Sequence, residues 1–128
     1  MQRNIFVQLI SLQVLIFFAN AHPAFSAANP TPEENLEQLI KTRKCRDCVL
    51  SGLNMTRLDL SGVDLQGADL SQSQLNLTNL SAANLKNTRL KGATFGGADL
   101  EGADLRGADF QDTSFSWAYL RGARMDEE

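Results

Sequence analysis

The sequence predicts an all-β solenoid with a short N-terminal α-helical cap, and three observations carry this prediction. From residue 50 to residue 125, every fifth residue is large, apolar and not β-branched. A period of five matches neither a helical turn nor the alternation of an ordinary strand, so it marks an internal repeat. Eight of the nine glycines stand two places after one of these apolar residues. A helix-start signal lies ahead of the repeat, at residues 31–34.

Each unit of five residues is expected to form one short side and one corner of a coil. A small residue mostly stands two places before the large apolar residue, and a polar residue separates the two. This in–out–in order is that of a short extended segment. Glycine then often occupies the position where the backbone turns. The large apolar positions are therefore the predicted core, with central examples at Leu60, Leu80, Leu100, Phe95 and Phe115.

Two consecutive units, 98–102 and 103–107, read Ala-Asp-Leu-Glu-Gly and Ala-Asp-Leu-Arg-Gly. Units of this kind resemble the repeats of pentapeptide-repeat proteins, and the resemblance covers about 80 of the 128 residues, because the units stay in register throughout. It implies a right-handed quadrilateral β-helix with four units per coil, and hence about four coils. At the usual strand spacing the rod would be roughly 15–20 Å long. Residues twenty apart would stack on one another.

The chain is expected to divide into three segments: a signal peptide at 1–28, a capping helix with its junction at 29–47, and the repeat domain at 48–128. Arg3 precedes a mostly apolar run from residue 5 to residue 19, and small residues follow, as in a signal peptide. Cleavage is expected after Ala21 or within 26–28, with preference for the latter. The alternative is an N-terminal membrane anchor. No later segment is long and apolar enough to cross a bilayer.

The predicted cap begins with a capping box. Thr31 is the expected N-cap, Pro32 the first helical residue, and Glu34 the reciprocal partner of Thr31. The helix is expected to extend for about ten to twelve residues, with an apolar face formed by residues 36, 39 and 40. Because the open end of a β-helix exposes unpaired backbone, we expect this face to cover the first coil. The alternative is a helix that docks a partner.

Two cysteines follow the helix at CxxC spacing. Cys45 and Cys48 occupy registers that direct both side chains inward at the junction. Export and the even cysteine count favour a structural disulfide. A redox-active pair is the alternative, since Arg43, Lys44 and Arg46 would favour a thiolate, although no thioredoxin-like pattern surrounds it. Free thiols and a metal site are further alternatives, but a metal would need two more ligands and the single histidine lies in the leader.

Residues 39–52, which contain the CxxC pair, also resemble the start of exported pentapeptide-repeat proteins of cyanobacteria and of the chloroplast thylakoid lumen. This resemblance implies a protein of the thylakoid lumen or the periplasm. Together with the signal peptide, it argues against cytosolic partners.

No catalytic site is predicted, and neither a metal nor a cofactor is expected. The mature chain lacks histidine, its hydroxyl residues lack a base, and aspartates recur because the repeat uses them. The net charge of −3 is too small to name a partner class. The prediction is a non-enzymatic structural or protein-interaction module whose protein partner is unknown. A thiol–disulfide redox protein acting through Cys45 and Cys48 is the alternative.

A minor alternative follows from the family resemblance. Some pentapeptide-repeat proteins imitate DNA in shape and charge and bind topoisomerases, which requires a strongly acidic rod and a cytosolic address. Here a leader exports the chain, and nucleic acid is not an expected partner. Several cations also dilute the acidic surface, namely Lys86, Arg89, Lys91, Arg106, Arg121 and Arg124.

One corner breaks the surface pattern. The positions 57, 77, 97 and 117 should be polar or glycine, yet they include Leu77 and Trp117, and Tyr119 lies just past this corner. We expect Trp117 to lie flat across Gly97 towards Leu77 and to form an exposed apolar strip of the kind that binds proteins. The alternative is that Trp117 merely covers the corner. No helix is expected over the last coil, so a homodimer through this C-terminal coil is the predicted form of self-association.

Overall fold

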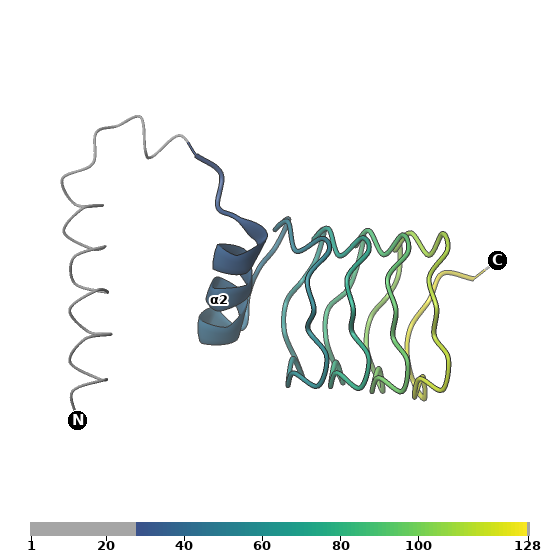
Figure 1. The fold of residues 1–128 in the computed structure, drawn as a ribbon. Coiled ribbons are helices and arrows are strands. Elements are labelled where there is room, and N and C mark those ends of the chain that lie inside the picture. Colours follow the sequence, from purple (N-terminus) through teal and green to yellow (C-terminus); the bar gives the residue numbers. More distant parts are fainter. Residues whose placement is uncertain (1–27, 128) are drawn as a thin grey trace, which may run out of the picture.

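The computed structural model describes residues 28–127 as one short helix followed by stacked coils. Helix α2 (Pro32–Thr42) stands at one end of the rod, and the chain then winds away from it towards the C-terminus (Figure 1). The predicted repeat architecture with an N-terminal helix is therefore confirmed. The predicted signal peptide lies outside the described residues, apart from its last residue. The single helix in the described range is too short to span a bilayer.

The coils are joined by thirteen isolated parallel bridges, and the described residues contain no regular strand. Each bridge connects residues twenty apart, as in Lys44 with Asp64 and Asp104 with Arg124. The bridges form four columns, one for each side of the coil. Only one residue per side bridges to the next coil before the chain turns, so a ladder never extends into a strand. The β character is thus confined to bridges.

Backbone hydrogen bonds connect each inner coil to both of its neighbours. Leu80 N–H donates to the Asp99 carbonyl of the next coil over 2.7 Å, and Asn79 N–H donates to the Leu58 carbonyl of the previous coil over 2.9 Å. A third bond closes each corner, as when Ala83 N–H donates to the Leu80 carbonyl over 3.0 Å. The short sides therefore leave few buried backbone groups without a partner.

The interior is a stack of large apolar side chains. Leu60, Leu80, Leu100 and Phe95 are fully buried, whereas Phe115 in the last coil is partly buried. The Phe95 and Phe115 rings are stacked, with centroids 5.0 Å apart and planes inclined by 11°. Large residues therefore lie directly on equivalent residues of the adjacent coil.

Three of the small inward positions hold buried hydroxyl residues, whose side chains bond to backbone carbonyls. Thr78 Oγ1 donates to the Met55 carbonyl of the previous coil over 2.8 Å. Ser73 Oγ and Thr88 Oγ1 donate within their own coils, over 2.6 and 2.7 Å. A buried hydroxyl with a hydrogen-bond acceptor costs little, which is why these positions accept serine and threonine as well as alanine.

Helix α2 begins as the sequence predicts, with both halves of the capping box between Thr31 and Glu34 formed. Its buried face matches the expected one in part. Leu39 is buried and Leu36 packs against the core, whereas Ile40 is 51% exposed. Asn35 is buried instead, and its Nδ2 donates to the Val49 carbonyl over 2.9 Å. This bond orients the helix with its 35/39 edge towards the first coil.

Arg43 closes the end of the helix and the end of the rod. It is the C-cap residue, with φ 60°, and its N–H donates to the Leu39 carbonyl. Its guanidinium donates to the carbonyl of Asp59 over 2.8 Å and to that of Ser61. In later coils, equivalent carbonyls accept from the preceding coil, as Asn79 accepts from Leu60 N–H. The side chain of Arg43 therefore replaces backbone donors at this end.

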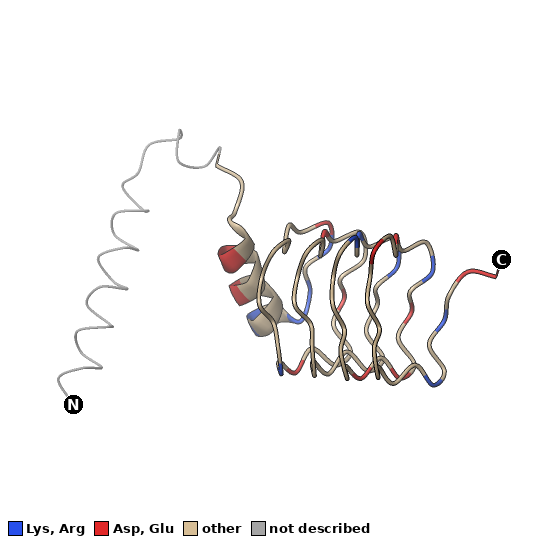
Figure 2. Cartoon of the chain, turned by 45° about the vertical axis from the view of Figure 1, so that its right-hand side comes forward, with Lys and Arg blue, Asp and Glu red and all other residues tan. Residues whose placement is uncertain are grey.

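Charges of both signs are interspersed along the coils (Figure 2). Asp104 pairs with two cations, with Arg106 Nη2 at 2.6 Å and with Lys86 Nζ at 3.5 Å. The hydrogen bonds from the Arg106 side chain, more than the nearby positive charges, hold the pKa of Asp104 well below its usual range. Asp104 in turn raises the pKa of Arg106.

The depressed pKa of Asp104 makes a testable contribution to acid stability. A carboxylate whose pKa is lower in the folded state stabilises the fold above its unfolded pKa of about 4, and this stabilisation is lost as pH falls through the folded value. Asp104→Asn is therefore expected to lower the melting temperature at neutral pH and to flatten its decline in acid. Melting temperatures between pH 7 and pH 2 measure this. Identical slopes for wild type and variant would contradict it.

Candidate functional site

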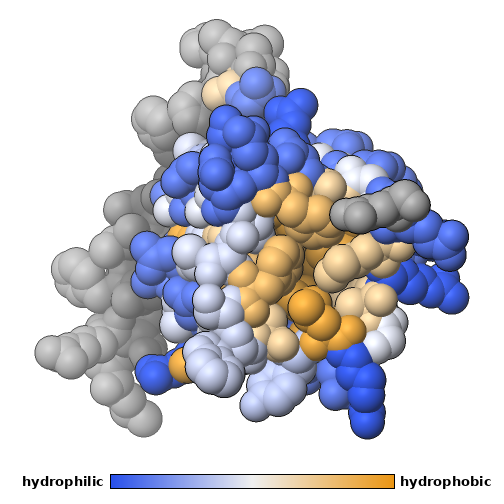
Figure 3. All heavy atoms as spheres, turned by 90° about the vertical axis from the view of Figure 1, so that its right-hand side faces the viewer, coloured by the Kyte–Doolittle hydropathy of each residue, from blue (hydrophilic) through white to orange (hydrophobic). Residues whose placement is uncertain are grey.

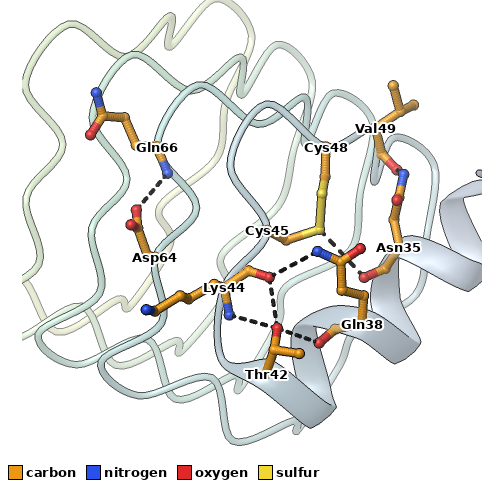
Figure 4. Close-up of a disulfide and its surroundings, with 9 residues drawn as sticks. All are labelled: Asn35, Gln38, Thr42, Lys44, Cys45, Cys48, Val49, Asp64 and Gln66. Atoms are coloured by element: carbon orange, nitrogen blue, oxygen red, sulfur yellow. Dashed lines mark hydrogen bonds between the residues drawn. A yellow bond between two sulfur atoms is a disulfide. The ribbon is translucent and has the colours of Figure 1, made fainter.

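Two parts of the molecule carry unusual chemistry, and the first is the junction between α2 and the first coil. Cys45 and Cys48 are joined by a disulfide, with an S–S distance of 1.97 Å and Cα atoms 5.4 Å apart. Figure 4 shows this bond beside Asn35 of α2. Cys45 Sγ lies 3.5 Å from the Asn35 carbonyl oxygen, and Val49, next to Cys48, accepts the hydrogen bond from the Asn35 side chain.

The two sulfur-bearing residues differ in exposure. Cys45 is 1% exposed and belongs to the core, whereas Cys48 is only partly buried. Cys48 also lines a pocket of about 480 Å³ between α2 and the junction. The other lining residues come from the segment before the helix, from the helix and from the junction itself: Asn29, Pro30, Asn35, Gln38, Arg46, Asp47 and Val49.

Two of the three cations near the cysteines bond to other groups. Arg46 Nε lies 2.8 Å from Asp64 Oδ2, and its Nη2 donates to Gln66 Oε1 over 2.6 Å. The Arg43 guanidinium is bonded to backbone carbonyls of the first coil. The Asp64 carboxylate offsets the charge of Arg46 and so reduces the electrostatic support that a catalytic thiolate would receive from this arginine.

The second candidate site is the aromatic corner, which we define as Leu77, Trp117 and Tyr119. Their exposed fractions are 52%, 92% and 63%, which is unusual for side chains of this size. Leu77 lies over Gly97, since its Cδ2 would be 2.9 Å from a Cβ atom at that position. Exposed aromatic residues are common anchors of protein interfaces.

The expectation that Trp117 lies flat across Gly97 is wrong. A side chain that is 92% exposed has almost no contact with the rod, so the indole projects into solvent. Leu77 already occupies the space over Gly97, so the indole ring has no free surface there on which to pack. The aromatic corner therefore consists of Leu77, of Trp117, which projects into solvent from the same column of corner positions, and of Tyr119 on the side of the coil that follows Trp117.

The end of the rod nearest the C-terminus is apolar at its centre and polar around its rim (Figure 3). Phe110, Phe115 and Leu120 of the last coil are only partly buried, and Met125 is exposed. Within residues 28–127, nothing covers this face as α2 covers the other end. The aromatic corner adjoins the same coil, because Trp117 and Tyr119 belong to it.

The described part of the chain contains no cluster of three potential metal ligands. The sequence did not reveal the inward role of Asn35 or the pocket beside Cys48. Asn35 lies four residues before the buried Leu39, so its place on the inner helix face was a usable signal. The pocket depends on how the segment before α2 folds back, and no residue pattern marks it.

A comparison with models of protein families supports the five-residue repeat. A family model described as pentapeptide repeats matches residues 44–81, 59–97 and 88–126. No curated protein matches the chain. Among solved structures, a pentapeptide repeat protein of the cyanobacterium Cyanothece 51142 is 26% identical, with a TM-score of 0.37, over 76% of this chain and 97% of its own.

Two other solved structures share part of their length with this chain. A pentapeptide repeat protein from the Arabidopsis thaliana thylakoid lumen is 37% identical, with a TM-score of 0.36, over 57% of this chain and 47% of its own. HetL from Nostoc sp. strain PCC 7120, described as involved in heterocyst differentiation regulation, is 28% identical, with a TM-score of 0.39. That match covers 64% of this chain and 40% of HetL.

Proposed function

The chain belongs to the pentapeptide-repeat family, and from this premise we propose that it is a non-enzymatic structural and protein-interaction module of an exported compartment. The fold that membership implies is a right-handed quadrilateral β-helix. The proposed division keeps residues 1–28 as a signal peptide, 29–47 as the cap and junction, and 48–128 as the repeat domain. The proposed compartment is the thylakoid lumen or the periplasm.

The observation that carries the interaction function is the exposure of the aromatic corner. Trp117 is 92% exposed, and exposing a large aromatic surface is unfavourable unless a partner covers it. The outward residues around the corner are small or polar, as Ser114 and Ser116 are, so the corner stands out from its surroundings. The disulfide supports an oxidising, exported address.

We favour binding over the two other functions considered. A catalytic thiol–disulfide role receives little support, because Asp64 offsets the charge of Arg46 and Cys45 is buried. A topoisomerase-binding DNA mimic would need a surface of negative charge throughout, whereas positive and negative side chains are interspersed along this rod. The proposed partner is therefore a protein, and neither a cofactor nor nucleic acid is proposed.

Trp117→Ala is the direct test of the aromatic corner. Because aromatic anchors commonly contribute about 2 kcal/mol or more to binding, the variant should retain only a few per cent of wild-type partner affinity. Tagged protein expressed in its own compartment, followed by pull-down and mass spectrometry, identifies the partners. Gln72→Ala is a matched control, since Gln72 is also an exposed corner residue with φ 60°. Equal recovery of the same partners by wild type and Trp117→Ala would refute the interaction function.

The same variants test self-association. We propose a homodimer through the C-terminal coil, supported by the apolar end face formed by Phe110, Phe115 and Leu120. Burial of this face against a second copy would remove apolar surface from water. Sedimentation at several concentrations should show a dimer for wild type and a weaker one for Trp117→Ala. A wild type that remains monomeric throughout would contradict the dimer and leave the pull-down result unaffected.

A further inference from the structure

We propose that Cys48 is the site at which a protein dithiol reduces the Cys45–Cys48 disulfide, with the fold remaining intact. The attacking protein would be an oxidoreductase that carries two cysteines of its own. This chain would then be a substrate of thiol–disulfide exchange and not its catalyst. The inference depends on the disulfide and its pocket. It does not depend on Trp117 and Tyr119, which belong to the last coil.

Exposure decides which sulfur is attacked. Thiol–disulfide exchange requires a thiolate to reach one sulfur, with the other as leaving group. Cys45 is 1% exposed and packed in the core, so an external thiolate cannot reach it in the folded protein. Cys48 is partly exposed and lines the pocket of about 480 Å³ beside α2. Attack through the pocket therefore occurs at Cys48 Sγ, and Cys45 Sγ leaves.

The pocket suits a protein reagent, because its walls can hydrogen-bond to a visiting backbone. Gln38 contributes a carboxamide whose nitrogen donates to the Lys44 carbonyl, so that its oxygen can accept from a visiting peptide N–H. Asp47 stands between the cysteines in the left-handed conformation, with φ 56°. That turn carries the Cys48 side of the bond at the surface while Cys45 remains in the core.

The reaction balances with the partner's own two thiols. A thiolate of the partner attacks Cys48 Sγ, a new sulfur–sulfur bond forms, and the bond between Cys48 and Cys45 breaks. The electron pair passes to Cys45 Sγ, which takes a proton from water. The partner's second thiolate then attacks the partner's first sulfur in the mixed disulfide. Cys48 leaves as a thiolate and takes a proton from water. The chain gains two electrons and two protons, and the partner becomes a disulfide.

The fold is prepared for the reduced state as well as for the oxidised one. In the disulfide, Cys45 Sγ carries no hydrogen, yet it lies 3.5 Å from the Asn35 carbonyl oxygen. Once reduced, the buried thiol has this carbonyl as a ready hydrogen-bond acceptor, at a distance normal for sulfur. The bond from Asn35 to the Val49 carbonyl, which holds α2 on the first coil, does not involve either sulfur. Reduction therefore leaves the cap in place.

A trapping experiment tests the attack site in the wild-type protein. The probe is a reduced thioredoxin whose second active-site cysteine is replaced by serine, so that the mixed disulfide cannot resolve. We expect a covalent adduct in native buffer, and peptide mass spectrometry should place it on Cys48 with at least about tenfold preference over Cys45. An adduct on Cys45, or an adduct that forms only in denaturant, would overturn the proposal.

Single-cysteine variants give an independent measurement. In Cys45→Ser, the remaining Cys48 thiol should react with the aromatic disulfide 5,5′-dithiobis(2-nitrobenzoate) at nearly the rate of a peptide thiol. In Cys48→Ser, the buried Cys45 should react at least about a hundredfold more slowly, because it must wait for local opening. Equal rates in two folded variants would overturn the assignment. Should either variant fail to fold, the wild-type trapping result decides.

Amide exchange tests whether the fold accommodates reduction. After full reduction of the wild type, protection of the amides in 32–42 should remain as it is in the oxidised protein. Loss of that protection would overturn the claim that the cap stays in place. None of these three readouts involves Trp117, so failure here leaves the interaction function standing, and failure of Trp117→Ala leaves the exchange site standing.

Discussion

Leu80→Ala is expected to lower the free energy of unfolding by about 2–5 kcal/mol, as deep truncations in rigid cores do. Leu80 is fully buried, and its column places Leu60 and Leu100 directly above and below it. The backbone on both sides is held by hydrogen bonds between coils, including the 2.7 Å bond from Leu80 N–H to Asp99. The side of the coil cannot move inward, so the cavity would persist.

Denaturant unfolding of the disulfide-bonded protein measures this effect. Gln72→Ala is the control, because Gln72 is exposed, and its change should remain within about 0.5 kcal/mol. If Gln72→Ala proved more destabilising than Leu80→Ala, the assignment of inward and outward positions would be incorrect. An unchanged m-value would show that the denatured state is comparable in all three proteins.

Phe95→Ala should be at least as costly, at about 3–5 kcal/mol. Phe95 is the largest fully buried side chain among the described residues, and its ring stacks on that of Phe115 over 5.0 Å. The truncation removes this ring from the core together with the stacking contact. Thermal and denaturant melts measure the loss.

Phe115→Ala is the matched comparison for Phe95→Ala. It removes the other ring of the same stacked pair, but Phe115 belongs to the last coil and is only partly buried. Its cost should therefore be clearly smaller, because water already reaches part of the ring and can fill the space. Equal costs for the two substitutions would indicate that the last coil is as well covered as the inner ones.

The period of five predicted most of the fold, because one repeated rule specifies side, corner and stacking neighbour. It could not show that sides are too short to form strands, since that depends on how many residues bridge before each corner. It also could not place Trp117. The rule assigns Trp117 to a corner, but the direction of the indole depends on Leu77, which occupies the space over Gly97, the corner residue between them in the same column.

The candidate sites were less predictable than the fold. The CxxC spacing indicated a disulfide, but the different exposures of Cys45 and Cys48 arise from how α2 packs on the first coil. Arg43 appeared in the sequence as one cation among several. Its bonds to the carbonyls of Asp59 and Ser61 exist only because the first coil has no preceding coil to supply donors.

The twenty-residue offset of the bridges has a consequence for how such a chain can change length during evolution. An insertion of twenty residues between inner coils would lengthen the rod by about 4.8 Å, and every side of the later coils would still face in its present direction around the rod axis. An insertion of five residues would instead rotate everything after it by a quarter turn. The aromatic corner would then point in a new direction relative to α2, while the core remained continuous. Duplication by whole coils thus adjusts reach, and duplication by single units adjusts orientation.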